Sequence, residues 1–151
     1  MQRKSLRSIG IDLGERRVGI AVSDSSGSVA TPLMTLYRNG HLGDTNDEFY
    51  QKIVDLALEY QVAFVVVGLP VNMDGSEGAT AESARYEAGL LAKLCAPNGI
   101  DVVLVDERLS STSSLAILNS GGTPGRKKKK VIDQVAASIL LQSWLDRARN
   151  G

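Results

Sequence analysis

Residues 8–24 read SIGIDLGERRVGIAVSD, and this stretch decides the fold because it predicts a β-hairpin. Two runs rich in β-branched residues flank a polar turn. The first run carries an acidic residue, Asp12, and the glycines near it, Gly14 and Gly19, let another backbone or a ligand approach closely. A buried carboxylate is costly unless it meets a cation or hydrogen-bond donors. Asp12 is therefore either a turn aspartate bonded to backbone N–H groups or a metal ligand.

The rest of the chain extends this hairpin into an α/β protein. The predicted strands cover residues 8–14, 17–24, 31–37, 63–70 and 99–107, the last two being continuous apolar runs typical of buried parallel strands. Helical spacing and capping residues predict helices over 46–62, from the loop after residue 70 to about 95, over 110–121 and over 131–148, with a loop at 123–130. The order indicates a mixed five-stranded sheet, three antiparallel strands followed by two parallel strands, with helices on both faces.

Size and composition are those of one ordinary globular domain. The chain has 151 residues, of which 43% are hydrophobic and 23% charged. No apolar run approaches the ~20 residues that a membrane span needs, and no signal peptide precedes the first strand, so we expect a cytoplasmic protein with no membrane contact. Cys95 is the single cysteine, which excludes an intrachain disulfide, and it lies in an apolar helical stripe that places it in the core.

Further acidic residues bear on the interpretation of Asp12. The segment VVLVDERL places Asp106 and Glu107 at the end of a buried strand, where alternate residues face opposite sides, so only one of them can face Asp12. The segment VIDQVAA places Asp133 in the first turn of the last helix, where an acid also complements the helix dipole. Carboxylates from two strand ends and one helix start can converge on a single site. Oxygen ligands without histidine or cysteine suit Mg²⁺ or Mn²⁺.

Basic residues are unevenly distributed, although the chain has 17 basic and 17 acidic residues and no net charge. Total charge therefore does not predict nucleic-acid binding. The run RKKKK at 126–130 is either a solvated loop or a basic arm that attracts phosphates past the acidic cluster, as a nuclease requires. Arg16 and Arg17 lie at the hairpin tip, where arginines are usually only solvated.

Four segments together resemble the YqgF/RuvX family of nucleases, which has a ribonuclease H-like fold. They read GIDLGERRVGIAVSD, FVVVGLPVNMDGSEG, VVLVDERLSS and KKVIDQVAASILLQSWL, and they occur in the family's order over about residues 8–146. The resemblance implies a single ribonuclease H-like nuclease domain over residues 1–151, and a metal-dependent hydrolase that processes the 5′ end of precursor 16S rRNA. The alternatives are a Holliday junction resolvase acting on four-way DNA and a non-catalytic module that binds structured RNA.

The resemblance also assigns site residues by position. The family's acidic triad falls on Asp12, Glu107 and Asp133, which are the expected catalytic residues and ligands of Mg²⁺ or Mn²⁺. The resemblance also places Arg108, Asn72 and Asp74 at family positions, and the basic run adds Lys128, Lys129 and Lys130 by its charge; these are the expected substrate-binding residues. Asn72 and Asp74 either contact a sugar or base edge or simply form a turn through Asx bonds. The expected partners are precursor rRNA or branched DNA and a ribosomal precursor particle, with the chain a monomer or weak homodimer.

One further resemblance concerns the first segment alone. DLGERRVGIAV is similar to the first phosphate loop of the actin and sugar-kinase group, which implies ATP binding. That group encloses its nucleotide between two such domains, whereas this chain has room for one and shows no second glycine-rich phosphate loop.

Overall fold

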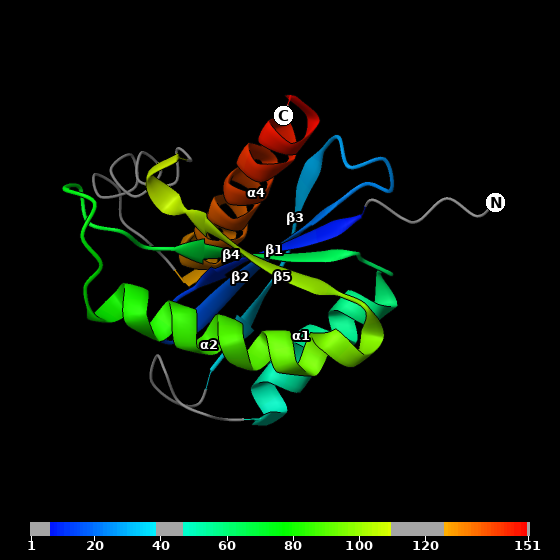
Figure 1. The fold of residues 1–151 in the computed structure, drawn as a ribbon, viewed down its shortest axis with the longest axis horizontal. Coiled ribbons are helices and arrows are strands. Elements are labelled where there is room, and N and C mark those ends of the chain that lie inside the picture. The colour runs from blue at the N-terminus through cyan, green and yellow to red at the C-terminus, as the bar shows by residue number, and fades with distance from the viewer. Residues whose placement is uncertain (1–6, 39–46, 110–125, 151) are drawn as a thin grey trace.

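A five-stranded mixed sheet forms the centre of residues 7–38, 47–109 and 126–150, the part of the chain that this computed structural model describes (Figure 1). The strands are β1 (Ser8–Leu13), β2 (Arg17–Ser23), β3 (Ala30–Tyr37), β4 (Phe64–Leu69) and β5 (Asp101–Asp106). Their order is β3-β2-β1-β4-β5, with β1 antiparallel to β2, β2 antiparallel to β3, and β4 parallel to both β1 and β5. The predicted sheet is therefore confirmed.

Helices cover both faces of this sheet, as predicted. They are α1 (Asp47–Glu59) and α2 (Ala79–Cys95), which lie on one face, and α4 (Arg126–Asn150), which crosses the other (Figure 1). The helix expected over 110–121 lies outside the described residues. None of the helices in the described ranges combines the length and hydropathy that a membrane crossing requires.

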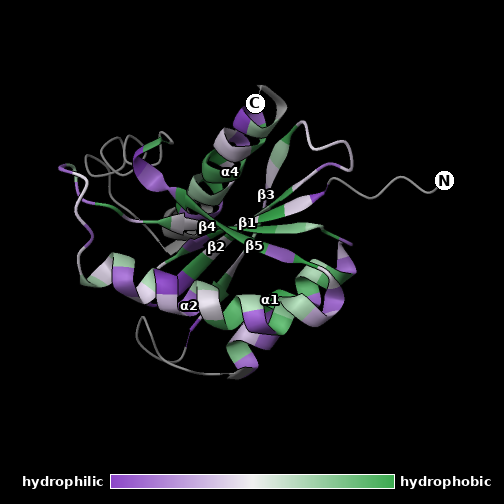
Figure 2. Ribbon diagram, viewed as in Figure 1, coloured by the Kyte–Doolittle hydropathy of each residue, from purple (hydrophilic) through white to green (hydrophobic). Residues whose placement is uncertain are grey.

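Alternating side chains along the strands build a separate apolar layer on each face. Ile9 and Ile11 of β1 belong to the layer under α1 and α2, which also contains Cys95, as predicted from its apolar stripe. Val66 of β4 belongs to the layer under α4, together with Leu141 of that helix. Figure 2 shows the hydrophobic residues concentrated on the central strands and on the helix surfaces that cover them. Residues of β1 with even numbers, Asp12 included, are therefore directed to the α4 face.

Helix α4 begins earlier than the sequence predicted. The basic run at 126–130 was expected to be a loop, but the helix starts at Arg126 and includes all of it. Lysine and arginine are good helix formers, and this propensity outweighs the unfavourable interaction of positive charge with a helix amino terminus. Asp133 consequently lies about two turns inside the helix rather than in its first turn, and the helix dipole does not explain its presence there.

Backbone-to-backbone contact fixes the position of α4 on the sheet. A Cβ atom added at Gly19 of β2 would lie 1.9 Å from the carbonyl oxygen of Asp133. A Cβ atom added at Gly10 of β1 would lie 2.7 Å from the Cβ atom of Leu141. The expectation that Gly14 and Gly19 admit a close backbone approach is confirmed at both positions. At Gly14 the approaching backbone is that of the hairpin turn, where the Gly14 N–H donates to the carbonyl of Arg17 at 3.0 Å.

Replacing Gly19 with alanine is expected to destabilise the protein, because the added methyl group overlaps the α4 backbone. Overpacking of this kind typically lowers the free energy of unfolding by about 1–3 kcal/mol. The control is Gly89→Ala in α2, where no atom lies within 4 Å of the added Cβ. That change is expected to stabilise the helix by up to about 1 kcal/mol. Urea unfolding measures both, and equal unfolding midpoints for the two variants would contradict the close contact at Gly19.

A buried ion pair joins the end of β3 to α2. The Arg38 guanidinium donates to the Glu87 carboxylate, and the two side chains are 3% and 0% exposed. Tyr50 of α1 donates its hydroxyl to the same carboxylate at 2.6 Å. Arg38 also donates to the backbone carbonyl of Gly14 at 3.1 Å. The network therefore connects both helices of one face to the hairpin turn that follows Asp12.

Candidate active site

Two of the three predicted acids meet on the α4 face of the sheet. Asp12 lies near the end of β1, beside Gly19 of β2 in the strand register, and Glu107 follows β5. The two side chains are hydrogen-bonded to each other. Strand β4 lies between β1 and β5, so the backbones that carry the two acids are two inter-strand spacings apart, roughly 10 Å. The side chains must reach across this distance to meet. The sequence therefore brings together two acids that are 95 positions apart (107 minus 12).

A glycine makes this long reach possible. Gly68 of β4 lies between the two acids in the sheet, and a Cβ atom added there would lie 2.6 Å from Oε1 of Glu107. The Glu107 side chain thus passes directly over the Gly68 backbone on its way to Asp12. The glycine of the segment GLPVNMDG has a structural function here that the sequence analysis did not identify.

Only one of the two neighbouring acids reaches Asp12, as alternation predicted, and it is Glu107, the residue that the family resemblance assigned. Asp106 is directed away from the pair and accepts hydrogen bonds from Arg108, with 2.8 Å between Nη2 and Oδ2. The Arg108 guanidinium holds the pKa of Asp106 below its usual range. Asp106 is therefore committed to a surface ion pair.

Asp133 stands beside the pair but is held by another residue. Its charge contributes to raising the pKa of Asp12, so it lies within electrostatic range. Its carboxylate accepts a hydrogen bond from the side chain of Arg17, at 2.8 Å between Nε and Oδ2. The sequence suggested that Arg16 and Arg17 are both merely solvated at the hairpin tip. Arg16 is exposed, but Arg17 is bound to Asp133.

All three acids hold their protons more tightly than free carboxyls do. Burial raises the pKa of Asp12 well above its ordinary value, and the neighbouring charges of Glu107 and Asp133 raise it further. Burial also raises the pKa of Glu107 and of Asp133, although the hydrogen bond with Asp12 and the ion pair with Arg17 oppose the rise. Clustered carboxyls with raised pKa values are typical of a functional site.

The donor chemistry of the Asp12–Glu107 pair fits a hard divalent cation. In their ionised forms the two carboxyls offer oxygen ligands, and a cation would relieve their mutual repulsion. Within the described residues, no three acidic, histidine or cysteine side chains stand in an arrangement that could hold a metal ion. The third predicted ligand, Asp133, is paired with Arg17 instead. The structure thus presents a two-carboxylate site with a third acid close by.

Substituting Asp12 with asparagine is expected to stabilise the protein at neutral pH, because the amide can still donate to Glu107 without a buried charge. The raised folded-state pKa means that the folded protein binds the Asp12 proton more tightly than the unfolded chain, whose value is about 3.9. The free energy of unfolding of the wild type therefore falls as the pH rises from about 4 through the folded-state pKa. The variant lacks this fall. Its free energy of unfolding should therefore exceed that of the wild type by an amount that grows to about 1 kcal/mol at pH 8.

Urea unfolding in EDTA from pH 4 to pH 8 measures this difference. A stability gap between Asp12→Asn and the wild type that stays constant or shrinks as the pH rises would contradict a raised pKa at Asp12.

The predicted substrate-binding residues lie at the same end of the sheet but only some are described. Asn72 and Asp74 form a turn, which was one of the two roles predicted for them. The Ser76 N–H donates to Oδ1 of Asp74 at 2.9 Å, and Nδ2 of Asn72 donates to the Ser76 hydroxyl at 3.0 Å. Arg108 lies next to this turn, because Nη1 would be 3.7 Å from a Cβ atom at Gly75. The side chains of Lys128, Lys129 and Lys130 lie outside the described part of the chain.

Comparison with known proteins identifies full-length relatives. The family model described as RuvX, Holliday junction resolvase, matches residues 6–147. A Myxococcus xanthus protein named "Putative pre-16S rRNA nuclease" is 40% identical over 144 residues, 95% of this chain and 90% of that protein. A Bacillus cereus protein of the same name is 39% identical over 145 residues, 94% of this chain and 99% of that protein.

Solved structures with low sequence identity share the fold. RuvC of T. thermophilus in complex with a Holliday junction substrate superposes with a TM-score of 0.59 at 12% identity, covering 95% of this chain and 96% of that one. The yeast mitochondrial Holliday junction resolvase Ydc2 gives a TM-score of 0.52 at 12% identity, covering 99% of this chain and 82% of that one. The expected ribonuclease H-like fold is confirmed by these resolvases.

Proposed function

The chain belongs to the RuvX family, and on that basis we propose that it is a nuclease, a hydrolase of phosphodiester bonds, that processes the 5′ end of precursor 16S rRNA. The observation that supports this proposal is the hydrogen-bonded pair of Asp12 and Glu107 with Asp133 beside it. Three carboxyls with raised pKa values, two at strand ends and one in α4, match the requirements of metal-assisted phosphodiester hydrolysis. The proposed partner is a ribosomal precursor particle in the cytoplasm.

We propose that Asp12, Glu107 and Asp133 hold Mg²⁺ or Mn²⁺. The bound cation would supply Lewis acidity toward the scissile phosphate and lower the pKa of water. Asp12 would bind the cation as a carboxylate, because the positive charge would offset the burial and the Glu107 charge that raise the pKa of Asp12. Gly68 allows Glu107 to take part, since any side chain at that position would block the path of Glu107 to Asp12.

The residues around the acids are proposed to position the nucleic-acid backbone. Arg108 is held by Asp106 beside the 72–76 turn, and from there its guanidinium can bind a phosphate next to the scissile one. Lys128, Lys129 and Lys130 precede Asp133 in the same helix and would add attraction for the phosphates. Asn72 and Asp74 shape the turn, and Asn72 is exposed and able to contact a sugar or base edge.

A second candidate function is resolution of four-way DNA, which the description of the family model and the fold shared with RuvC both favour. Symmetric cleavage of a junction requires two active sites and hence a dimer, whereas processing of one RNA end needs only a monomer. Sedimentation of the purified protein with each substrate therefore bears on the choice between them.

Cleavage mapping on both substrates tests the proposal. The protein is incubated with an RNA that contains the 5′ end of precursor 16S rRNA and, separately, with a synthetic four-way DNA junction, each in Mg²⁺, Mn²⁺ or EDTA. We expect metal-dependent cleavage near the mature 5′ end of the RNA and none of the junction. Cleavage of the junction alone would instead support the resolvase function. Binding of RNA without cleavage under any metal condition would indicate a non-catalytic module and refute the nuclease.

A further inference from the structure

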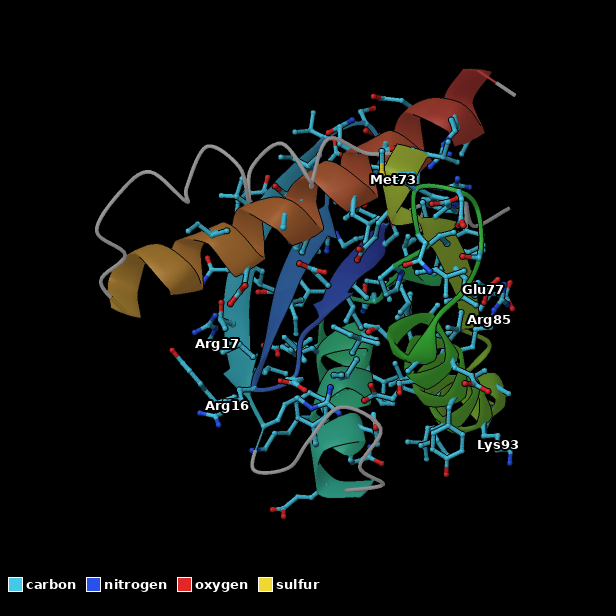
Figure 3. All side chains as sticks on the ribbon, turned by 90° about the vertical axis from the view of Figure 1, so that its left-hand side faces the viewer. Arg16, Arg17, Met73, Glu77, Arg85 and Lys93 are labelled. Carbon is cyan, nitrogen blue, oxygen red and sulfur yellow. The ribbon has the colours of Figure 1, made fainter. Side chains whose placement is uncertain are left out.

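The ion pair between Arg17 and Asp133 links the hairpin to the acidic site. Arg17 is the first residue of β2, and its Nε atom lies 2.8 Å from Oδ2 of Asp133 in α4. The two side chains are 34% and 23% exposed, so solvent and ligands can reach both. Figure 3 shows Arg17 beside the amino-terminal half of α4, while Arg16 lies farther from that helix.

This ion pair is not needed to attach α4 to the sheet. The helix backbone already rests on Gly19 and Gly10, and the Gln134 side-chain amide donates to the Thr35 hydroxyl at 3.2 Å. A partly exposed ion pair adds at most about 1 kcal/mol to the stability of a protein. Docking of α4 therefore does not explain why Asp133, whose charge acts on Asp12, is paired with Arg17.

The guanidinium occupies the carboxylate that a metal ion would need. Asp12 and Glu107 supply two carboxyl groups, and Asp133 is the acid that would complete a three-ligand site. Arg17 neutralises Asp133 and places a positive charge near the position of the cation. Arg17 holds the Asp133 carboxylate through Oδ2, which fixes its orientation, and the positive charge of the guanidinium repels a cation bound at the same carboxylate. Arg17 and a divalent cation are therefore expected to compete for Asp133.

We propose that Arg17 is a displaceable counter-ion that holds Asp133 until a nucleic-acid phosphate draws the guanidinium away. Phosphate accepts two parallel hydrogen bonds from arginine, so it is an effective competitor for Arg17. Once released, Asp133 becomes the third ligand of the cation bound by Asp12 and Glu107. Nucleic acid and metal then strengthen each other's binding, and by linkage the effect is equal in both directions. This inference rests on the proposed function, because it assigns the three acids to a metal.

Metal titration without turnover tests the coupling. Mn²⁺ binding is measured by calorimetry, alone and with a saturating phosphorothioate hairpin RNA, which resists hydrolysis. We expect the RNA to tighten Mn²⁺ binding to the wild type by about fivefold, the scale of one partly exposed ion pair. The Arg17→Gln variant should bind Mn²⁺ about fivefold more tightly than the wild type without RNA, and RNA should add little. Arg16→Gln is the matched control and should behave like the wild type.

A second variant keeps the test decisive if Arg17→Gln is unstable. Asp133→Asn should bind Mn²⁺ without RNA about as tightly as the wild type, because Arg17 already withholds Asp133 in that state. The tightening caused by RNA should disappear in this variant. The proposal is overturned if Arg17→Gln gains no Mn²⁺ affinity over the wild type, or if Asp133→Asn weakens Mn²⁺ binding equally with and without RNA.

These measurements separate the inference from the proposed function. If the wild type cleaves neither RNA nor DNA but the Mn²⁺ titrations show the expected coupling, the nuclease assignment fails while the competition between Arg17 and the metal stands. If cleavage occurs but the titrations show no coupling, only the counter-ion proposal fails.

Discussion

Cleavage of RNA by the Asp12→Asn variant is expected to fall by at least about a thousandfold relative to the wild type. Asp12 pairs in the sheet with Gly19, which contacts the Asp133 backbone, and its pKa is raised by the charges of both Glu107 and Asp133. The Asp12→Asn change would remove a negative ligand from the cation. A bound cation stabilises the transition state by several kcal/mol, and weaker binding of the cation would lose much of this. Each 1.36 kcal/mol corresponds to a tenfold change in rate, so a loss of about 4 kcal/mol gives this factor. Single-turnover cleavage in Mg²⁺ measures it.

The matched control for this variant is Asp55→Asn. Asp55 is exposed on α1, on the opposite side of the sheet from the acidic pair, and accepts a hydrogen bond only from Gln51 of the same helix among the bonds that the described residues show. Its substitution should leave the cleavage rate within about twofold of the wild type, as surface changes away from a site usually do. Because Asp12→Asn is also expected to be the more stable protein at neutral pH, a lost activity cannot be attributed to unfolding. Cleavage within tenfold of the wild-type rate would remove Asp12 from the active site.

The Glu87→Gln variant is expected to lose about 3–5 kcal/mol of unfolding free energy, the largest stability change that the structure predicts. The change leaves the Arg38 guanidinium buried without a negative partner, and an uncompensated buried charge has this cost. Tyr50 also loses its charged acceptor. Because small domains are stable by only about 5–15 kcal/mol, the variant is expected to unfold at a much lower urea concentration than the wild type.

Two further variants distinguish the ion pair from a general effect of changing α2. Glu82→Gln lies on the same helix with an exposed side chain and should leave the urea midpoint almost unchanged. The triple variant Arg38→Met, Glu87→Leu, Tyr50→Phe removes all three polar partners together and should recover most of the lost stability. A Glu87→Gln midpoint equal to that of Glu82→Gln would contradict the burial of the pair.

Local patterns in the sequence predicted most of the sheet and half of the acidic site. Strand propensity located all five strands within two residues of their observed ends, because apolar runs of that kind have few alternative structures. Alternation predicted only that one of Asp106 and Glu107 faces Asp12, and it was the family resemblance that pointed to Glu107. Gly19 was recognised as a position of close approach, although the segment that approaches it was not identifiable from the hairpin.

Interactions between distant segments were not predictable in the same way. The partners Arg17 and Asp133 are 116 positions apart, and nothing near either residue indicates the other. The start of α4 was missed because the basic run was interpreted by its charge instead of its helix propensity. Glu87 did leave a signal: it follows Ala84 by three positions and precedes Leu91 by four on the buried stripe of α2, where a charged residue implies a buried partner.

Helix α4 rests on Gly19 and Gly10, and this contact affects which substitutions can move Asp133. At Gly19 the distance of Asp133 from the sheet is set by contact between two main chains, with no side chain between them. Core variation of the kind that shifts α1 or α2 by an ångström would leave the spacing between Asp133 and Asp12 intact. Substitution of either glycine is therefore the change expected to move α4, and Asp133 with it, away from the sheet.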